Sequence, residues 1–139
     1  MNTDIEKENE GCRLIAYRDS VNVLTIGYGH TKNVREGQVI SQDQADEWLI
    51  DDLHDALMYV NKDVKVPLSD GQLSALVDFV FNVGGKNFAG STLLKLLNEG
   101  KYQEVIAQFA RWNFAGGHVL VGLTRRRAAE AAMFKSGTV

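Results

Sequence analysis

The sequence has a single cysteine and a single proline among its 139 residues. Because Cys12 has no partner, no disulfide can form within the chain, which fits folding in a reducing compartment. A chain of this length buries roughly two thirds of its unfolded surface, which is enough for a core without covalent cross-links. No stretch rich in proline, glycine or serine and no internal repeat divides the chain. We therefore expect one domain over residues 1–139.

Long apolar runs are also lacking, which predicts neither a membrane-spanning helix nor stable insertion into a membrane. The first ten residues do not have the basic start and apolar segment of a secretory signal, so we expect a protein that stays inside the cell that makes it. The net charge of -3 argues against a nucleic-acid partner. His30, His54, His118 and Cys12 are too scattered to resemble a metal-ligand motif, so we expect no metal and no cofactor.

Apolar residues at helical spacing, together with start and stop signals, predict that most of the chain is helical. Serine or threonine followed three residues later by glutamate or glutamine marks three of the helix starts. The expected helices cover about 3–10, 41–60, 69–83, 91–99, 102–112 and 124–134. The first of them is unusually polar, with Ile5 and Cys12 flanking charged positions. Trp48 and Trp112 fall on apolar helix faces and are expected in the core.

The segment 13–29 has a different pattern, because β-type residues surround the turn formers Asp19, Ser20 and Asn22. This pattern predicts a β-hairpin, with a further strand near Val39 and Ile40. Helices packed beside a small sheet make an α+β fold. We expect a small β lobe at about 12–40 and a helical lobe at about 60–139 that also packs the N-terminal helix, with a long helix as the connector.

Three residues of this region carry groups that glycoside hydrolysis needs. Glu10 falls at the end of the first helix, Asp19 falls at the hairpin turn, and Thr25 follows on the partner strand. Such enzymes use one carboxylic acid to protonate the leaving oxygen and a second carboxylate to stabilise positive charge or activate water. The spacing alone leaves simpler interpretations open: Glu10 as an exposed helix residue, Asp19 as a turn former and Thr25 as a strand residue.

A longer pattern surrounds these residues. Glu10-Gly-Cys-Arg-Leu-Ile-Ala-Tyr-Arg-Asp19, followed by Thr25-Ile-Gly-Tyr-Gly-His-Thr31, resembles the active-site segment of phage-type lysozymes, glycoside hydrolase family 24. Four later blocks resemble the family in the expected order: Phe81-Asn-Val-Gly84, Phe88-Ala-Gly-Ser91, Arg111-Trp112 and Gly122-Leu-Thr-Arg-Arg-Arg127. The resemblance therefore covers nearly the whole chain, and its first block is highly specific.

The resemblance implies a lysozyme-like fold and an endo-acting muramidase, which cleaves between N-acetylmuramic acid and N-acetylglucosamine without a cofactor. It implies that Glu10 is the general acid and that Asp19 and Thr25 position a water for attack with inversion. Substrate contacts are expected at Gly29, His30, Phe81 and Asn82, although His30 alone is equally consistent with a residue that shapes the turn.

The resemblance also implies that an arginine at the start of the last helix pairs with Glu10. Arg125 aligns best, and Arg126 stays an alternative because three consecutive arginines blur the register. The run also has a simpler interpretation as the solvated start of a helix. Cations are unfavourable near a helix N-terminus, which makes a nearby carboxylate partner more attractive.

The resemblance also implies the setting of the protein. The expected partner is the glycan strand of bacterial peptidoglycan, and the expected protein is a monomer that takes part in phage or prophage lysis. It would wait in the host cytoplasm until a membrane-lesion protein releases it to the periplasm. Two other functions stay open: a catalytically silent module that binds wall glycan, and a lytic transglycosylase, which needs no water-positioning aspartate.

The chain departs from the family at one position of the hairpin. Asn22 stands where the family usually has glycine. Asparagine tolerates a positive φ better than most residues, so we expect the turn to form at some cost. The acidic net charge is also atypical, since many lysozymes of this kind are basic.

Overall fold

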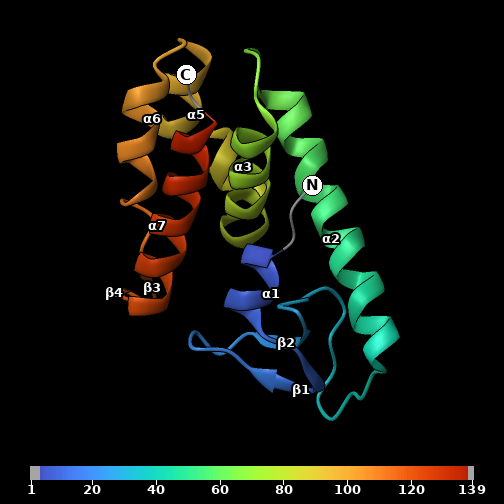
Figure 1. The fold of residues 1–139 in the computed structure, drawn as a ribbon. Helices are drawn as coiled ribbons and strands as arrows, with labels where there is room; N and C mark the ends of the chain where they lie inside the picture. Colours follow the sequence, from blue (N-terminus) through green and yellow to red (C-terminus); the bar gives the residue numbers. More distant parts are fainter. Residues whose placement is uncertain (1–3, 138–139) are drawn as a thin grey trace.

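The computed structural model of the protein describes residues 4–137, which form seven helices and two small antiparallel sheets. Figure 1 shows a helical lobe above a small sheet, with the helix α2 (Gln42–Asp63) running along both. This is the α+β arrangement of helices beside a small sheet that the sequence predicts. Within the described residues, no helix combines the length and the apolar character that crossing a membrane requires.

The small sheet is a hairpin of β1 (Arg13–Arg18) and β2 (Leu24–Gly27), as the β-type residues predict. Asn22 turns the chain with a φ of 68°, a conformation that asparagine tolerates. The further strand expected near Val39 is reduced to one bridge to Ile15.

Two long helices begin at the predicted serines. The Ser41 side chain accepts a hydrogen bond from the backbone N–H of Gln44 at the start of α2. Ser69 and Gln72 form both hydrogen bonds of a capping box at the start of α3 (Asp70–Val83). Such caps satisfy backbone donors that a helix start leaves unpaired, which is why this short pattern locates helices reliably.

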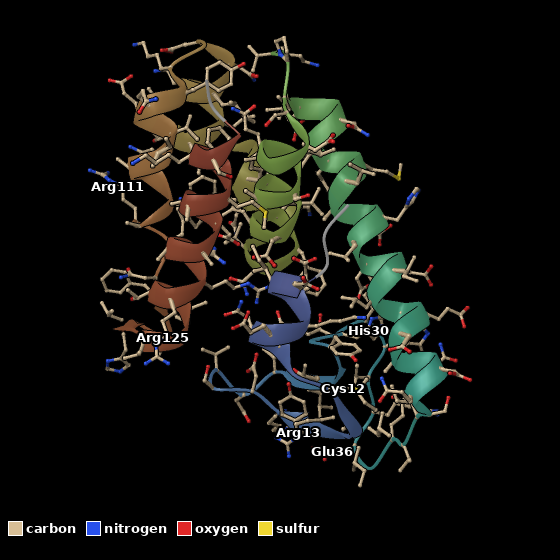
Figure 2. The ribbon with its side chains drawn as sticks, viewed as in Figure 1. Cys12, Arg13, His30, Glu36, Arg111 and Arg125 are labelled. Atoms are coloured by element: carbon tan, nitrogen blue, oxygen red, sulfur yellow. The ribbon has the colours of Figure 1, made fainter. Side chains whose placement is uncertain are left out.

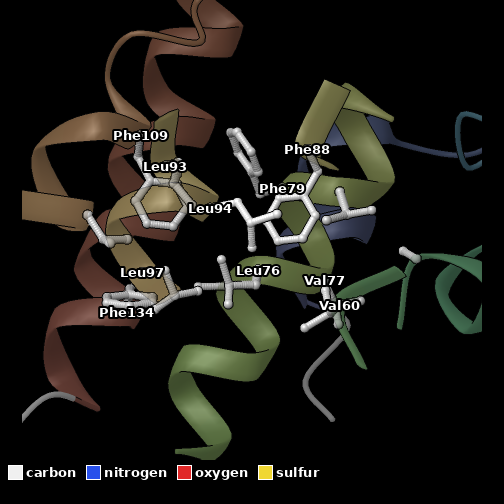
Figure 3. Close-up of a cluster of buried hydrophobic side chains, with 14 of the residues drawn as sticks. Val60, Leu76, Val77, Phe79, Phe88, Leu93, Leu94, Leu97, Phe109 and Phe134 are labelled. Atoms are coloured by element: carbon white, nitrogen blue, oxygen red, sulfur yellow. The ribbon is translucent and has the colours of Figure 1, made fainter. Parts of the chain in front are cut away.

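The main core lies in the helical lobe, around α3 (Figure 3). It is closed by α5 (Thr92–Asn98), α6 (Tyr102–Phe109) and α7 (Val121–Ser136). The ring of Phe79 meets those of Phe88, Phe109 and Trp112 edge to face. Burial of each large apolar side chain contributes about 1.5–3 kcal/mol, so this cluster provides the apolar cohesion of the lobe.

The polar helix α1 (Asp4–Glu10) packs against α7 and ends at Gly11, whose φ is 61°. Its predicted end is confirmed, whereas the expected cap residue Thr3 lies outside the described residues. The helix buries Ile5 together with the charged residue Glu6. Its docking therefore depends on a polar partner as well as on apolar contact.

The C-terminal third differs from the expected boundaries. The helix α6 ends at Phe109, three residues before the predicted end at Trp112. The expected loop holds a hairpin of β3 (Phe114–Ala115) and β4 (His118–Val119), and the short helix α4 (Gly85–Ala89) was also not predicted. The last helix begins after Leu120, so Thr124 is not its cap. Instead, the Thr124 hydroxyl donates back to the Leu120 carbonyl within the first turn.

Candidate active site

Glu10 is the last residue of α1 and reaches toward the small sheet with a side chain that is 19 % exposed. Its Oε2 atom accepts a hydrogen bond from Nη1 of Arg126 at 2.5 Å. Its Oε1 atom lies against Gly29, where an added Cβ would come within 2.6 Å of that oxygen. Glu10 is therefore held between an arginine of α7 and the backbone that follows β2.

The arginine that meets Glu10 corrects the preferred sequence alignment. Arg125 was expected, but the ion pair to Glu10 is made by Arg126, the stated alternative. Figure 2 shows Arg125 at the beginning of α7, where it is exposed, whereas Arg126 and Arg127 are buried. Helical geometry separates consecutive residues by about 100°, so only one of three adjacent arginines can face a given partner.

Asp19 is fixed at the hairpin turn. Its Oδ1 atom accepts hydrogen bonds from the backbone N–H groups of Val21 and Val23 at 3.0 and 2.9 Å. Its Oδ2 atom has no hydrogen-bond partner among the described residues, so it can accept one from a water or a substrate. The carboxylate is thus oriented by the turn while one oxygen stays available.

Thr25 is buried on β2, next to this turn. Its hydroxyl donates to the Val23 carbonyl at 2.8 Å, which leaves the lone pairs of the hydroxyl oxygen to accept a hydrogen bond. No hydrogen bond or ion pair joins Glu10 to Asp19 or Thr25 within residues 4–137. Burial and the charge of Glu10 raise the pKa of Tyr17, and the charge of Asp19 adds to the effect.

The four expected substrate contacts have different environments. Gly29 and Phe81 line one pocket of about 650 Å³. His30 is buried: its Nδ1 lies 2.7 Å from Asp52 Oδ2, its Nε2 lies 3.0 Å from the Lys32 carbonyl oxygen, and its ring stacks on Trp48. The side-chain oxygen of Asn82 accepts a hydrogen bond from Arg127. The position and stacking of His30 match a residue that shapes the turn.

The pocket opens between the loop after β2, α2 and the end of α3, next to the Glu10 site. Burial raises the pKa of Asp52, although the hydrogen bond and the charge of His30 oppose this change. The pocket has aromatic and cationic walls as well as carboxylates, a mixture suited to a ligand with many hydroxyl groups. Its lining residues are Gly29, Thr31, Lys32, Asp52, Asp55, Ala56, Met58, Tyr59, Lys62, Val80, Phe81 and Gly85.

A buried polar cluster lies behind Glu10, and sequence analysis missed it. Asp78 of α3 accepts two hydrogen bonds from Arg126, from Nε at 3.0 Å and from Nη2 at 2.7 Å. Glu6 of α1 and Glu130 of α7 both bond to the same carboxylate. Arg127 lies 2.9 Å from Glu130 and over the ring of Phe79. The available signal was Asp78 itself, a lone carboxylate within the apolar run Leu-Val-Asp-Phe-Val.

Three carboxyl groups of this cluster titrate far from their ordinary range. Burial, followed by the hydrogen bond to Asp78, raises the pKa of Glu6 to about 9 and that of Glu130 to about 10. Burial alone would raise the pKa of Asp78, but hydrogen bonds from Glu130 and Arg126 and the charge of Arg126 lower it to about 2. At neutral pH Glu6 and Glu130 are therefore protonated and neutral. Asp78 is ionised there, so its negative charge offsets one of the two positive charges of Arg126 and Arg127.

Comparison with known proteins gives the family of the chain. The family model "Phage lysozyme" matches residues 7–130. The chain is 42% identical over 134 residues to an endolysin of Acyrthosiphon pisum secondary endosymbiont phage 1, covering 94% of this chain and 92% of that protein. It is 45% identical to an endolysin of Bacillus phage PZA over 95% of its own length, and it spans only 52% of that longer protein.

Solved structures with a similar fold include a phage lysozyme. A crystal structure of a P22 lysozyme mutant superposes with a TM-score of 0.79 at 37% identity, covering 95% of this chain and 93% of the other. The family match, the relatives and the fold all point to lysis through degradation of peptidoglycan. The chain therefore belongs to the phage lysozyme family, and it is a peptidoglycan-hydrolysing muramidase.

Proposed function

We propose that the chain cleaves the bond between N-acetylmuramic acid and N-acetylglucosamine with inversion, and that Glu10 is the general acid. The observation that carries this proposal is the placement of Glu10 at the end of α1, with Oε2 bonded to Arg126 and Oε1 beside Gly29. In this placement, one carboxyl oxygen is fixed by a charge-assisted hydrogen bond. The other oxygen can carry the proton that the leaving group takes.

Asp19 and Thr25 hold the attacking water in this proposal. Asp19 Oδ2 and the Thr25 hydroxyl oxygen are both acceptors, and a water that donates to both has its own lone pair free for the anomeric carbon. In an inverting glycosidase the base carboxylate activates this water from the face opposite to the acid. A lytic transglycosylase needs no such water, so the fixed acceptor at Asp19 favours hydrolysis.

The substrate lies over Gly29 and Phe81, which line the pocket beside Glu10. His30 and Asn82 contribute indirectly, because their side chains are bonded to Asp52 and Arg127. The proposed chemistry needs no cofactor and a single copy of the chain. The endolysin names of the relatives support a role in host lysis. Release from the host cytoplasm through a membrane-lesion protein, without stable membrane insertion, completes the proposal.

The test compares the wild type with Glu10→Gln and Asp19→Asn on purified peptidoglycan, with released sugar ends identified by mass spectrometry. We expect new reducing muramic ends from the wild type and a loss of at least about 100-fold for each variant, in the range of a removed general acid. Glu8→Gln is the matched control, since Glu8 is an exposed residue of the same helix.

Each alternative gives a distinct product pattern. Anhydro-muramic ends would identify a transglycosylase. Saturable binding to the wall without any new ends would identify a silent glycan-binding module. Wild-type turnover by Glu10→Gln would remove Glu10 from the role of general acid.

A further inference from the structure

Arg126 makes three hydrogen bonds, and two of them go to the same carboxylate. Its Nε and Nη2 atoms donate to the two oxygens of Asp78, and only Nη1 donates to Glu10. A guanidinium is planar and rigid, so a bidentate bond along one edge fixes the direction of the remaining N–H groups. The orientation of the group that meets Glu10 is thus determined by Asp78.

Asp78 is itself held from three elements. It belongs to α3, its side chain is fully buried, and protonated Glu6 of α1 and Glu130 of α7 hydrogen-bond to it. The two hydrogen bonds from Arg126 occupy both oxygens of this buried carboxylate, and Glu6 and Glu130 lie close to it. A buried carboxylate that is held at both oxygens has little freedom to turn, and it gives Arg126 a fixed anchor.

The charge of Arg126 poses a chemical problem for a general acid. A cation beside a carboxyl group favours the ionised form, with a typical effect of 1–3 pH units on the titration. A general acid must instead hold its proton until the leaving oxygen takes it. An anion bonded along the other edge of the same guanidinium reduces the net charge that the acid experiences.

We propose that Asp78 is a positioning residue for the muramidase reaction: through Arg126 it aims one N–H at Glu10 and offsets the positive charge there, so that Glu10 retains its proton. This inference rests on the proposed role of Glu10 as general acid. Glu6 and Glu10 face the Arg126–Asp78 pair from α1, and Arg127 and Glu130 face it from α7.

The experiment measures kcat and KM against pH on soluble peptidoglycan fragments for the wild type and Asp78→Asn. Without the anion, the charge of Arg126 acts on Glu10 in full, so the alkaline limb of the kcat/KM profile should move to lower pH. We expect a shift of about one pH unit, the lower end of the usual range, because Glu6 and Glu130 can ionise and replace part of the lost charge. KM should change less than about two-fold, because Asp78 does not line the pocket.

Asp70→Asn is the matched control. It removes the same charge from the same helix at an exposed position eight residues away, about 12 Å along the axis. Its profile should coincide with that of the wild type. An unmoved alkaline limb in folded Asp78→Asn would overturn the proposal, as would an equal shift in Asp70→Asn.

Asp78→Glu is the second variant, and it tests the role of Asp78 if Asp78→Asn fails to fold. It keeps the negative charge but lengthens the side chain, which misaligns Arg126. We expect the alkaline limb to stay in place while kcat falls about ten-fold. Wild-type kcat in Asp78→Glu would overturn the positioning role. Glu10→Gln distinguishes failure of the proposed function from failure of this inference. If Glu10→Gln stays active, the proposed role of Glu10 fails. If Glu10→Gln is inactive but the Asp78 variants behave like the wild type, only the role of Asp78 is rejected.

Discussion

Gly29 leaves no room for a side chain beside Glu10. An added Cβ would lie 2.6 Å from Oε1 and 2.7 Å from Cδ of Glu10, and the φ of Gly29 is 72°. Gly29→Ala should therefore displace the carboxyl group of Glu10, the proposed general acid, as well as strain the backbone. We expect kcat/KM to fall by at least about ten-fold, since small displacements of a reacting group cost this much or more.

Gly37→Ala separates the two effects of that substitution. Gly37 has a similar φ of 74°, but nothing lies within 4 Å of its added Cβ. Both variants should lose about 1 kcal/mol of stability from the left-handed backbone, which thermal unfolding measures, whereas only Gly29→Ala should lose activity. Equal activity in the two variants would contradict a direct contact between Gly29 and Glu10.

At the scale of residues, the sequence predicted which side chains belong to the candidate site better than it predicted their interaction partners. Glu10, Asp19 and Thr25 could be named because they fall in one specific motif, and their roles stay predictions. The choice between Arg125 and Arg126 needed the rotation of α7, which three consecutive arginines do not define. The partners of Asp78 come from α1 and α7, so no local pattern could reveal them.

The loop after β2 is joined to α2 by one buried histidine. His30 bonds to Asp52 and stacks on Trp48, both of which belong to α2. The same loop has a second ion pair, in which Lys32 meets Asp55, but both of those side chains are more than half exposed, at 64% and 52%. The buried bond should therefore contribute more to holding the loop, since exposed pairs are screened by water.

Asp52→Asn and Asp55→Asn test this difference on the same helix. Loss of a buried charge-assisted hydrogen bond costs about 1.5–3 kcal/mol, and loss of an exposed ion pair costs about 0–1 kcal/mol. Chemical denaturation should show this order, with Asp52→Asn the less stable variant. A larger loss of stability in Asp55→Asn than in Asp52→Asn would show that the exposed ion pair, and not the buried histidine, holds the loop to α2.

At the scale of elements, local signals located the helices that have caps. The bonds of Ser41 and Ser69 at the starts of α2 and α3 confirm two such predictions. The predicted start of α7 at Thr124 was wrong. The helix begins after Leu120, whose apolar side chain cannot accept a capping hydrogen bond and so gives no sequence signal. The hairpin of β3 and β4 was missed because each strand has only two residues, too few to show an alternating pattern.

At the scale of the molecule, two kinds of interaction hold the helical lobe together. The aromatic core around Phe79 could be expected from apolar periodicity. The second is the polar cluster of Glu6, Asp78, Arg126, Arg127 and Glu130, which joins α1 and α7 to α3. The helix α1 is unusually polar, and the buried residue Glu6 makes this polarity part of the interface. Stability should therefore depend on pH in a way that an apolar core would not produce.

The direction of that dependence follows from the retained protons. In the unfolded chain glutamate loses its proton near pH 4.3, whereas burial raises the pKa of Glu6 to about 9 and that of Glu130 to about 10 in the folded protein. Between these limits the folded protein binds more protons than the unfolded chain. The stabilisation is thus fully present below about pH 4.3, decreases as the pH rises, and is lost once Glu6 and Glu130 ionise.

Asp78 acts in the opposite direction at low pH. Its pKa of about 2 lies below the ordinary value of about 3.9. Its stabilisation is therefore present above about pH 3.9 and is lost as the pH falls through 2. Together the three groups place the most stable range of the cluster in weak acid, from about pH 4 to 5.

Glu130→Gln tests this dependence, because glutamine keeps the neutral shape of the protonated acid but cannot ionise. Each retained proton changes the free energy of unfolding by up to about 1.4 kcal/mol per pH unit. We expect the wild type to lose stability between pH 6 and pH 9 in urea denaturation, and Glu130→Gln to lose clearly less, with the remaining loss due to Glu6. Glu104→Gln, at an exposed position of α6, should follow the wild type. An identical loss in Glu130→Gln would mean that Glu130 is already ionised in the folded protein, and that the cluster is held together by charges alone.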